Sequence, residues 1–290
     1  MLNAVVILQS IVSGLLMGGM FALLGVGFSL TWGVMKVINI AHAAFGILAA
    51  YIAYWALTLY KVDPVLSLVL STPLLFATGL VIYRLLIQPI TRAKDVVVAS
   101  MILTFGLAIV IENFMLLVWS PDERLITTSY SSQAIFIGDI IIKVSSLIGF
   151  ILSLLGIAAI YFFLHHTHTG KAVRATWQEP EGAALQGINL QRVSMITFAL
   201  AIASAGAGGV TMAYMYSFNP PAHNLWLIFL FLVVILGGVG SVLGSAAAGL
   251  IIGLIIGLCS AFFPQQWINV LLFALLMVIL LIKPQGLFRT

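Results

Sequence analysis

Charged side chains are scarce in this sequence. Of its 290 residues, 12 are Lys or Arg and 8 are Asp or Glu, so 7% are charged, whereas soluble domains carry about 25%. Hydrophobic residues make up 62%, and the mean hydropathy is +1.21. So few charges cannot cover the surface of a soluble fold of this length. The composition excludes a soluble enzyme, a secreted disulfide scaffold, a disordered chain and a nucleic-acid-binding domain, and predicts a polytopic membrane protein.

Two further absences narrow the chemistry. Cys259 is the single cysteine, so no internal disulfide can form and cysteine usage marks no compartment. No phosphate-binding loop of the form G-x-x-x-x-G-K-[ST] occurs, because Gly170-Lys171 has His165 where the first glycine should stand. The sequence therefore contains no loop of this common type for binding the phosphates of a nucleotide.

The residues that bind metals or nucleic acids elsewhere form no such cluster here. His165, His166 and His168 have no nearby carboxylate or cysteine cluster, so we expect no metal site. The net charge of +4 comes from basic residues that form no dense run. We interpret them by the positive-inside rule of membrane proteins rather than as a phosphate-binding patch.

Uncharged stretches recur at the length of a membrane span. About 20 apolar residues cross the roughly 30 Å of hydrocarbon as a helix, whereas barrel strands would show segments of about ten residues with alternating polarity. We therefore predict an all-α, polytopic transmembrane bundle, with a single membrane-embedded domain over residues 1–290. The expected spans cover residues 4–35, 37–60, 64–87, 96–119, 144–164, 194–216, 225–238, 241–262 and 267–282.

The last third of the chain leaves the number of spans open. No charged residue occurs between Arg192 and Lys283, and this stretch fits three or four crossings. With the segment 165–193 in the cytoplasm, four crossings put nine of the 12 Lys and Arg residues inside, and three crossings put seven there. The positive-inside rule prefers four. We expect about eight or nine membrane elements and an external N-terminus.

Two polar segments separate the spans. In the external loop 120–143, two β-branched runs flank Gly138-Asp139, which is a two-residue hairpin signal; this small hairpin is either a structured loop or a cap that docks a partner. In the cytoplasmic segment 165–193, Pro180 suits the first turn of a helix and Gly187 its C-terminal end. The pattern predicts a helix of about two turns. A helix this short is only marginally stable unless the membrane domain or a partner holds it.

Several motifs, in order along the chain, resemble one family. The stretch Pro180–Asn189 is similar to the coupling-loop motif of permease subunits in bacterial ATP-binding-cassette importers of the high-affinity branched-chain amino acid type. The same family is matched by Val37–His42, Thr169–Ala175, Leu236–Ser241 and Lys283–Phe288. The resemblance covers essentially the whole chain, although Gly182 departs from the alanine expected there, which should loosen the coupling helix.

The resemblance implies a division of labour. The short cytoplasmic helix would sit in a groove of an ATPase subunit and transmit its closure to the spans. Coupling would then involve Arg174, Pro180, Glu181, Ala183, Ala184, Leu185 and Gly187. ATP and Mg²⁺ would bind the ATPase subunits. This chain is therefore expected not to be an enzyme and to bind no cofactor. The expected partners are a homologous second permease subunit, two ATPase subunits, an external solute-binding protein and the lipid of a bacterial inner membrane, but no nucleic acid.

The implied function is the translocation of branched-chain or related neutral amino acids by alternating access. The same importer class also serves urea, short amides and aromatic acids, so the substrate stays open. An ion-coupled secondary transporter or channel is the alternative from another class. It usually needs buried acids, bases or rings of charge, for which Glu112 is the sole candidate. An intramembrane enzyme would need a nucleophile–base or metal constellation, which the sequence lacks.

Candidate residues for the translocation path are few. Asn39 and His42 are three apart and are expected to share a helix face, either lining the path or fixing helix packing as a hydrogen-bonded pair. Glu112 is expected near the outer interface, as a substrate contact or a solvated helix end. A glycine-rich break interrupts the late apolar run and must be buried or border a cavity. It contains Gly237, Gly238, Gly240 and Ser241.

Other glycines are expected to pack helices. Gly14 and Gly18 lie on one helix face, and Gly249, Gly253 and Gly257 lie on another. Small residues at this spacing permit close helix contact in lipid. Each face meets either a neighbouring helix of this chain or a second permease subunit.

Overall fold

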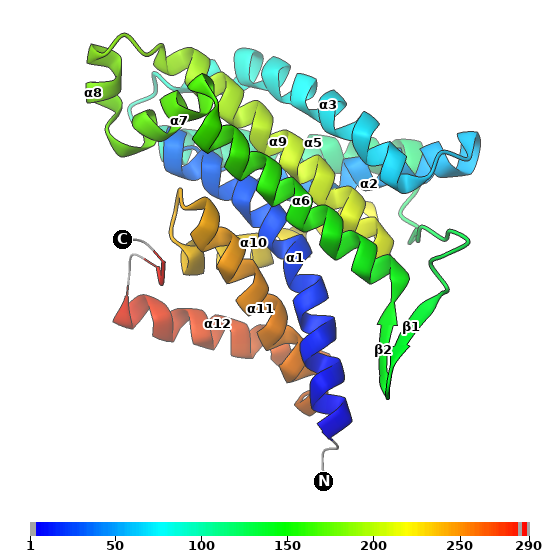
Figure 1. Cartoon of the computed structure of the whole chain (residues 1–290). Coiled ribbons are helices and arrows are strands. Elements are labelled where there is room, and N and C mark those ends of the chain that lie inside the picture. The colour runs from blue at the N-terminus through cyan, green and yellow to red at the C-terminus, as the bar shows by residue number, and fades with distance from the viewer. Residues whose placement is uncertain (1–3, 284–285, 289–290) are drawn as a thin grey trace.

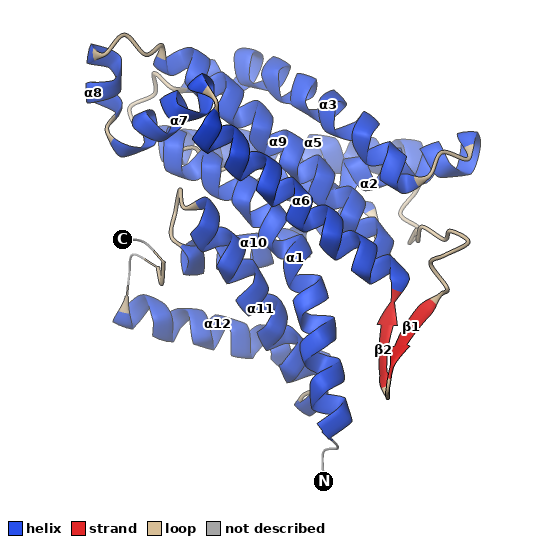
Figure 2. Cartoon of the chain, in the orientation of Figure 1, coloured by secondary structure: helices blue, strands red, loops and turns tan. Residues whose placement is uncertain are grey.

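The computed structural model describes residues 4–283 and 286–288, with the backbone alone at position 265. Long helices cross one another at moderate angles, and a small hairpin projects from one end (Figure 1; Figure 2). The elements are α1 (Ala4–Met35), α2 (His42–Tyr60), α3 (Pro64–Ile82), the π-helical turn Tyr83–Ile87, α4 (Gln88–Ile90), α5 (Val96–Trp119), β1 (Ala134–Ile137), β2 (Ile140–Lys143), α6 (Val144–His166), α7 (His168–Gln178), α8 (Pro180–Leu185), α9 (Leu190–Met215), the 3₁₀ turn Pro220–Ala222, α10 (His223–Gly237), α11 (Val242–Phe262) and α12 (Gln265–Ile282).

Eight helices of the described chain are long and apolar enough to cross a membrane. They are α1, α2, α3 with its continuation through α4, α5, α6, α9, α10 with the turn before it, and α11. Helix α12 is a shorter apolar helix. The prediction of an all-α bundle with about eight or nine membrane elements and a small hairpin is confirmed.

The hairpin forms where the sequence predicted it. Strands β1 and β2 pair antiparallel from Ala134 opposite Lys143 to Ile137 opposite Ile140. The turn between them begins at Gly138, whose φ of +61° suits glycine. The Gln9 side chain of α1 pairs with the backbone of Ile141, donating to its carbonyl at 2.9 Å and accepting from its N–H at 2.8 Å. This double hydrogen bond holds β2 against the first turns of α1.

The second expected span begins later than predicted. Residues 36–41 are not helical, and α2 starts at His42. Helix α1 ends where Lys36 adopts a left-handed φ of +55°. The expectation that Asn39 and His42 share a helix face is therefore wrong, because Asn39 precedes the helix. An uncharged β-branched run gives no stop signal in the sequence, and hydroxyl groups of α5 replace the missing helical hydrogen bonds, as detailed below.

The uncharged last third contains four helices, α9 to α12. Three of them are among the candidate spans, while α12 is a shorter apolar helix, so the choice of four crossings over three stays a prediction. That choice counted Arg289, which lies outside the described residues, as do Pro284 and Gln285 of the closing motif. Gly286 lies close to Gly238, and the Leu287 N–H donates to the Leu236 carbonyl at 2.8 Å. The described part of the closing motif therefore packs against the turn between α10 and α11.

The two glycine faces pack against each other within this chain. They carry Gly14 and Gly18 on α1 and Gly249, Gly253 and Gly257 on α11. A Cβ atom on Gly14 would lie 2.6 Å from the Gly253 carbonyl oxygen, and one on Gly18 would lie 2.8 Å from the Leu250 Cα. Such distances mean that the backbones themselves touch. The sequence left the partner of each face open, and the structure places it on a neighbouring helix.

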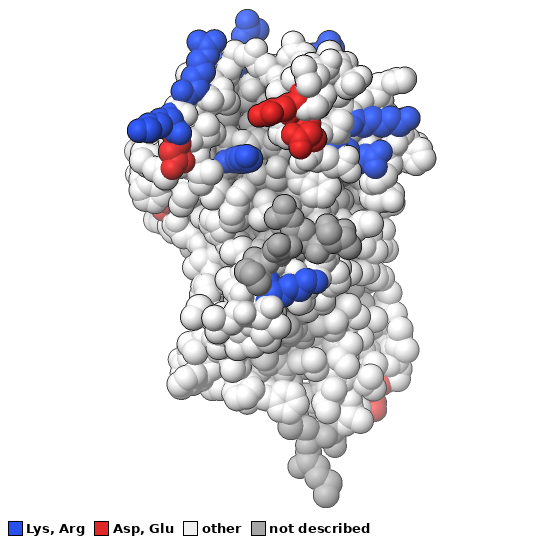
Figure 3. Space-filling model, turned by 90° about the vertical axis from the view of Figure 1, so that its left-hand side faces the viewer, with Lys and Arg blue, Asp and Glu red and all other residues white. Residues whose placement is uncertain are grey.

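The bundle has two distinct ends. We call the end with α7, α8 and the α10–α11 turn the α8 end, and the opposite end with β1 and β2 the hairpin end (Figure 1). In the face shown by Figure 3, Lys, Arg, Asp and Glu side chains gather at the top, at the α8 end, while the flank below is almost entirely uncharged. Charges gathered at one end above an almost uncharged surface are expected of a helical membrane protein.

Replacing Gly253 with Leu should destabilise the bundle, because the new side chain has no space between α1 and α11. Overpacking a core costs about 1–3 kcal/mol, and backbone-to-backbone contact leaves the least room to adjust. The thermal midpoint of the purified protein measures the effect. Gly106→Leu on α5 is the matched control, since a Cβ there meets nothing within 4 Å. Equal midpoints for the two variants would contradict the packing.

Candidate functional site

Helix α8 is a six-residue helix held between two longer ones. Pro180 occupies its first position and Glu181 its first turn, where a proline needs no donor and an acid suits the helix dipole. It ends because Gly187 adopts a φ of +80°, which lets the Ile188 N–H donate to the Ala183 carbonyl at 3.1 Å. Asn189 then caps α9 by accepting the Arg192 N–H at 2.9 Å. The predicted short helix and both of its boundary residues are therefore where the sequence placed them.

One side of α8 is buried and the other is open. The Ala183 side chain is 5% exposed, whereas Leu185 is 87% exposed. Glu181 and Ala184 are exposed as well. A leucine this open on a short helix has no packing role within the described chain. The exposed face of α8, which we define as Glu181, Ala184 and Leu185, is therefore suited to contact another protein.

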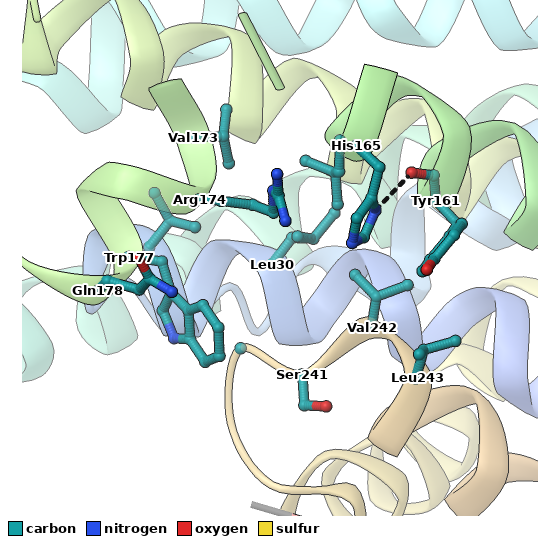
Figure 4. A pocket seen from close by; sticks show the side chains of 13 residues that line it. Leu30, Tyr161, His165, Val173, Arg174, Trp177, Gln178, Ser241, Val242 and Leu243 are labelled. Carbon is teal, nitrogen blue, oxygen red and sulfur yellow. Dashed lines mark hydrogen bonds between the residues drawn. The ribbon is translucent and has the colours of Figure 1, made fainter. Parts of the chain in front are cut away.

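Helix α7 connects α8 to the spans. Thr167 caps it by accepting the Gly170 N–H at 2.9 Å, and Gly170 packs directly on the backbone of α6. Near its other end, the Trp177 indole lies against Gly240 in the turn between α10 and α11 (Figure 4). The same turn is anchored to α1, because the Gly240 N–H donates to Ser29 Oγ at 2.9 Å.

The glycine-rich break is a turn that joins α10 to α11. Gly237 ends α10 and packs on Gly244, while Gly238 and Gly240 have φ values of +84° and +87°. A residue with a Cβ would be strained at both positions. Gly240 and Ser241 line a cavity of about 200 Å³. The turn thus borders a cavity, at the α8 end.

The same cavity holds Arg174, which the sequence grouped with the coupling residues. Its side chain points into the space between α6, α7 and the turn (Figure 4). Arg174 is therefore separated from the exposed face of α8.

The break before α2 is stabilised by two hydroxyl groups of α5. Ser100 Oγ accepts the Ile38 N–H at 3.2 Å, and Thr104 Oγ1 accepts the Ile40 N–H at 3.0 Å. Thr104 Oγ1 also lies 3.0 Å from the Ile38 carbonyl oxygen, to which it can donate. Non-helical backbone at membrane depth needs such partners, since hydrocarbon supplies none.

Asn39 and His42 lie in this break and at the start of α2, and both are fully buried. The His42 Nε2 atom lies 3.2 Å from the Leu24 carbonyl of α1. Its Nδ1 atom and both polar atoms of the Asn39 amide have no hydrogen-bond partner in the described chain. Buried polar groups are normally satisfied, so these three atoms stand out among the described residues. The two residues lie close in the chain, although not on one helix face.

Glu112 is paired rather than solvated. Its Oε2 atom lies 2.9 Å from His223 Nε2, at the first residue of α10. The His223 side chain is 3% exposed and that of Glu112 is 20% exposed. Sequence reasoning missed His223 because it lies after two prolines, between the expected spans 194–216 and 225–238. One signal for this pair was present in the sequence, because a lone acid in a span is expected to have a polar partner.

A second polar cluster at the hairpin end was also missed. The Tyr130 hydroxyl donates to Asp63 Oδ2 at 2.7 Å, and the Tyr214 hydroxyl donates to Oδ1 of the same carboxylate at 3.3 Å. Burial raises the pKa of Tyr130, so its hydroxyl keeps the proton that it donates. The cluster ties the α2–α3 connection to the external loop and to α9.

The three clustered histidines are engaged in other contacts or stand apart. His165 Nδ1 lies 2.9 Å from the Tyr161 carbonyl, and its ring stacks on that of Tyr161. His166 stacks on Phe162. Across the residues that the structure describes, no group of three or more His, Cys, Asp or Glu side chains is arranged to hold a metal ion.

Comparison with known proteins gives a consistent result. Residues 10–281 match the model of a family described as the permease component of branched-chain amino acid transport systems. The chain is 27% identical to the high-affinity branched-chain amino acid transport system permease protein BraD of Pseudomonas aeruginosa, over 96% of this chain and 94% of that protein. It is equally similar to LivH of Escherichia coli K12, over the same shares. A probable LivH of Methanocaldococcus jannaschii is 28% identical over 80% of this chain and 75% of that protein. No solved structure matches the chain.

Thr104→Val should destabilise the protein, because it removes a hydroxyl without changing the shape of the side chain. The Ile40 N–H would be left unsatisfied, at a cost of about 1–3 kcal/mol. The thermal midpoint should fall by several degrees. Thr78→Val on α3 is the control, since the Thr78 hydroxyl donates only to a carbonyl one turn earlier on an exposed surface. A larger effect at Thr78 would argue against this role for Thr104.

Proposed function

Because the chain belongs to the family of permease components of branched-chain amino acid transport systems, we propose that it forms the membrane pathway of an ATP-driven importer and that α8 couples this pathway to the motor. The chain is a multi-pass membrane protein and a permease subunit, not the subunit that hydrolyses ATP. Permeases of this class work with ATPase and binding-protein partners.

The open face of α8 is the observation that supports the coupling role. A hydrophobic side chain that is 87% exposed, at Leu185, fits the groove of another protein. Glu181 and Ala184 flank it, while Ala183 anchors the opposite side. Pro180 and Gly187 fix where the helix begins and ends. The whole element is small enough to move as a rigid unit between α7 and α9.

A movement of α8 has two routes into the spans. One runs directly into α9, whose first turn is capped by Asn189. The other runs through α7, where Trp177 presses on Gly240 and so on the turn between α10 and α11. Arg174 faces the cavity beside this second route. Its part in coupling is therefore that of a positioning residue, which acts through the turn and does not touch the ATPase.

The distribution of charge supports placing the α8 end in the cytoplasm. Lys171, Arg174 and Arg192 all belong to that end, and the positive-inside rule assigns it to the cytoplasmic side. The ATPase subunits then bind at α8, and the external binding protein docks at the hairpin end. A second homologous permease subunit completes the pathway.

We assign the substrate path to the unpaired polar atoms of the core. Asn39 and His42 are fully buried and carry both donors and acceptors, which suits a neutral, zwitterionic molecule. Glu112, with His223, is the polar contact nearer the hairpin end. The turn of Gly237, Gly238, Gly240 and Ser241 borders the route at the α8 end.

The substrate class proposed is branched-chain amino acids. The named relatives are permeases for these substrates, and the core offers few charges for an ionic ligand. Urea, short amides and aromatic acids are the alternatives within the same importer class. An ion-coupled secondary transporter is less favoured, because Glu112 is the sole acid in a span and is engaged with His223.

Uptake by the complete importer in proteoliposomes tests the substrate. Labelled leucine should accumulate only with ATP and the binding protein, and excess isoleucine or valine should suppress it. Excess urea or acetamide should leave it unchanged. Competition by urea or acetamide instead of valine would move the assignment to the amide branch. Uptake that persists without the ATPase subunits would favour ion coupling.

Ala184→Asp and Glu181→Lys should uncouple ATP hydrolysis from transport. Each places an unmatched charge in the docked face of α8, where desolvation is costly. Substrate-stimulated uptake per ATP should fall at least about tenfold, which corresponds to ~1.4 kcal/mol. Ala93→Asp is the control, as an exposed alanine in the α4–α5 link at the same end. Normal coupling in both α8 variants would refute the assignment.

A further inference from the structure

The cavity at the α8 end is a built pocket with mixed walls. It has a volume of about 200 Å³ and lies between the last turns of α1, the end of α6, helix α7 and the α10–α11 turn. Leu30, Val34, Leu164, Val173, Val242 and Leu243 give it apolar walls. Pockets that bury a drug-sized ligand measure roughly 300–1,000 Å³. This one therefore accommodates a small group rather than a whole metabolite of that size.

The polar side chains of the pocket are cationic or neutral. Arg174 and His165 both point into it, and Gln178 lies at its edge (Figure 4). No Asp or Glu is among the lining residues. The salt bridges within the described chain involve Arg124 and His223 and leave Arg174 out. The pocket thus contains the Arg174 guanidinium and no carboxylate in its walls.

Arg174 has one buried polar atom without a partner. Its Nε atom is buried and has no hydrogen-bond partner among the described residues. Arginine stays charged at all relevant pH values, and burying an unpaired polar group of a cation is costly. His165 donates its Nδ1 proton to the Tyr161 carbonyl, which holds its ring at the wall of the pocket. An anion with several oxygen atoms suits this arrangement, because a guanidinium can bind two of its oxygens through parallel N–H bonds.

The position of the pocket along the membrane spans indicates where such an anion comes from. Helix α6 is a span that ends at His166, one residue after the pocket residue His165. Leu30 and Val34 belong to the last turns of another span, α1. The pocket therefore lies at the level where a membrane span ends, where phospholipid headgroups lie. Its apolar walls suit the glycerol and first methylene groups behind a headgroup phosphate.

We propose that this pocket binds the phosphate group of an anionic phospholipid, with Arg174 as its main ligand and His165 and Gln178 beside it. Free inorganic phosphate has the same chemistry at the guanidinium but makes no use of the apolar walls. A bound headgroup contacts α6, α7 and the α10–α11 turn together. It thereby braces the route from α8 through Trp177 to the spans.

Lipid binding by the purified, delipidated complex tests the proposal without relying on transport. Native mass spectrometry would compare phosphatidylglycerol with diacylglycerol, which has no phosphate, in the wild type and in Arg174→Gln and Arg174→Lys. Lys171→Gln is the matched control, since Lys171 is an exposed cation on the same helix and does not line the pocket. Inorganic phosphate is titrated separately, with the thermal midpoint as the signal.

The wild type should retain phosphatidylglycerol and not diacylglycerol. Arg174→Gln should weaken this binding at least about tenfold, Arg174→Lys should weaken it less, and Lys171→Gln should leave it unchanged. A thermal shift by inorganic phosphate alone that depends on Arg174 would support the anion site and name free phosphate as its source. Equal lipid binding by wild type and Arg174→Gln, with no Arg174-dependent phosphate shift, would overturn the proposal. Circular dichroism establishes that the variants are folded.

Discussion

Direct backbone contact between α1 and α11 is the constraint on which the rest of this structure depends. Lipid tails are as apolar as leucine, so helices in a membrane gain little from hiding apolar surface and associate through close packing. Gly14 and Gly253 remove the side chains that would hold the helices apart. The same device brings α2 to α9, where Gly46 and Gly209 touch. The contacts between α1 and α11 hold α11 in place. They thereby position the α10–α11 turn, on which Trp177 of α7 packs.

At two breaks between spans, a hydroxyl group or a glycine accommodates the irregular backbone. Before α2, Ser100 and Thr104 supply the hydrogen bonds that a helix would have made internally. Between α10 and α11, the Ser29 hydroxyl accepts the Gly240 N–H, and the glycines of the turn tolerate its positive φ angles because they have no side chain. Both breaks therefore join segments from distant parts of the sequence. In the importer that we propose, these bonds are where a shift of one helix would reach its neighbour.

The sequence predicted what charge and length determine. Spans ended at charged or turn residues, Gly138-Asp139 predicted the hairpin, and Pro180 with Gly187 bounded α8. It could not predict the break before α2, because Val37 to Ile40 is as apolar as a span and its hydrogen bonds come from α5. Nor could it pair Glu112 with His223 or place Arg174 in a pocket. Each of these depends on how distant helices meet, and periodicity within a segment carries no information about that.

Helix α5 shows why these missed contacts matter. It lies at the edge of the bundle with much of its surface exposed, yet it makes polar contacts in both of its halves. Thr104 bonds to the break next to the buried Asn39, and Glu112 bonds to His223 where α10 begins. A helix is stiff along its axis, so these two points cannot move independently. The pairing of Glu112 with His223 therefore joins α5 to α10, while Thr104 joins the same helix to the break beside the buried Asn39. In the importer that we propose, α5 is thus the connection between the end where the binding protein docks and the core.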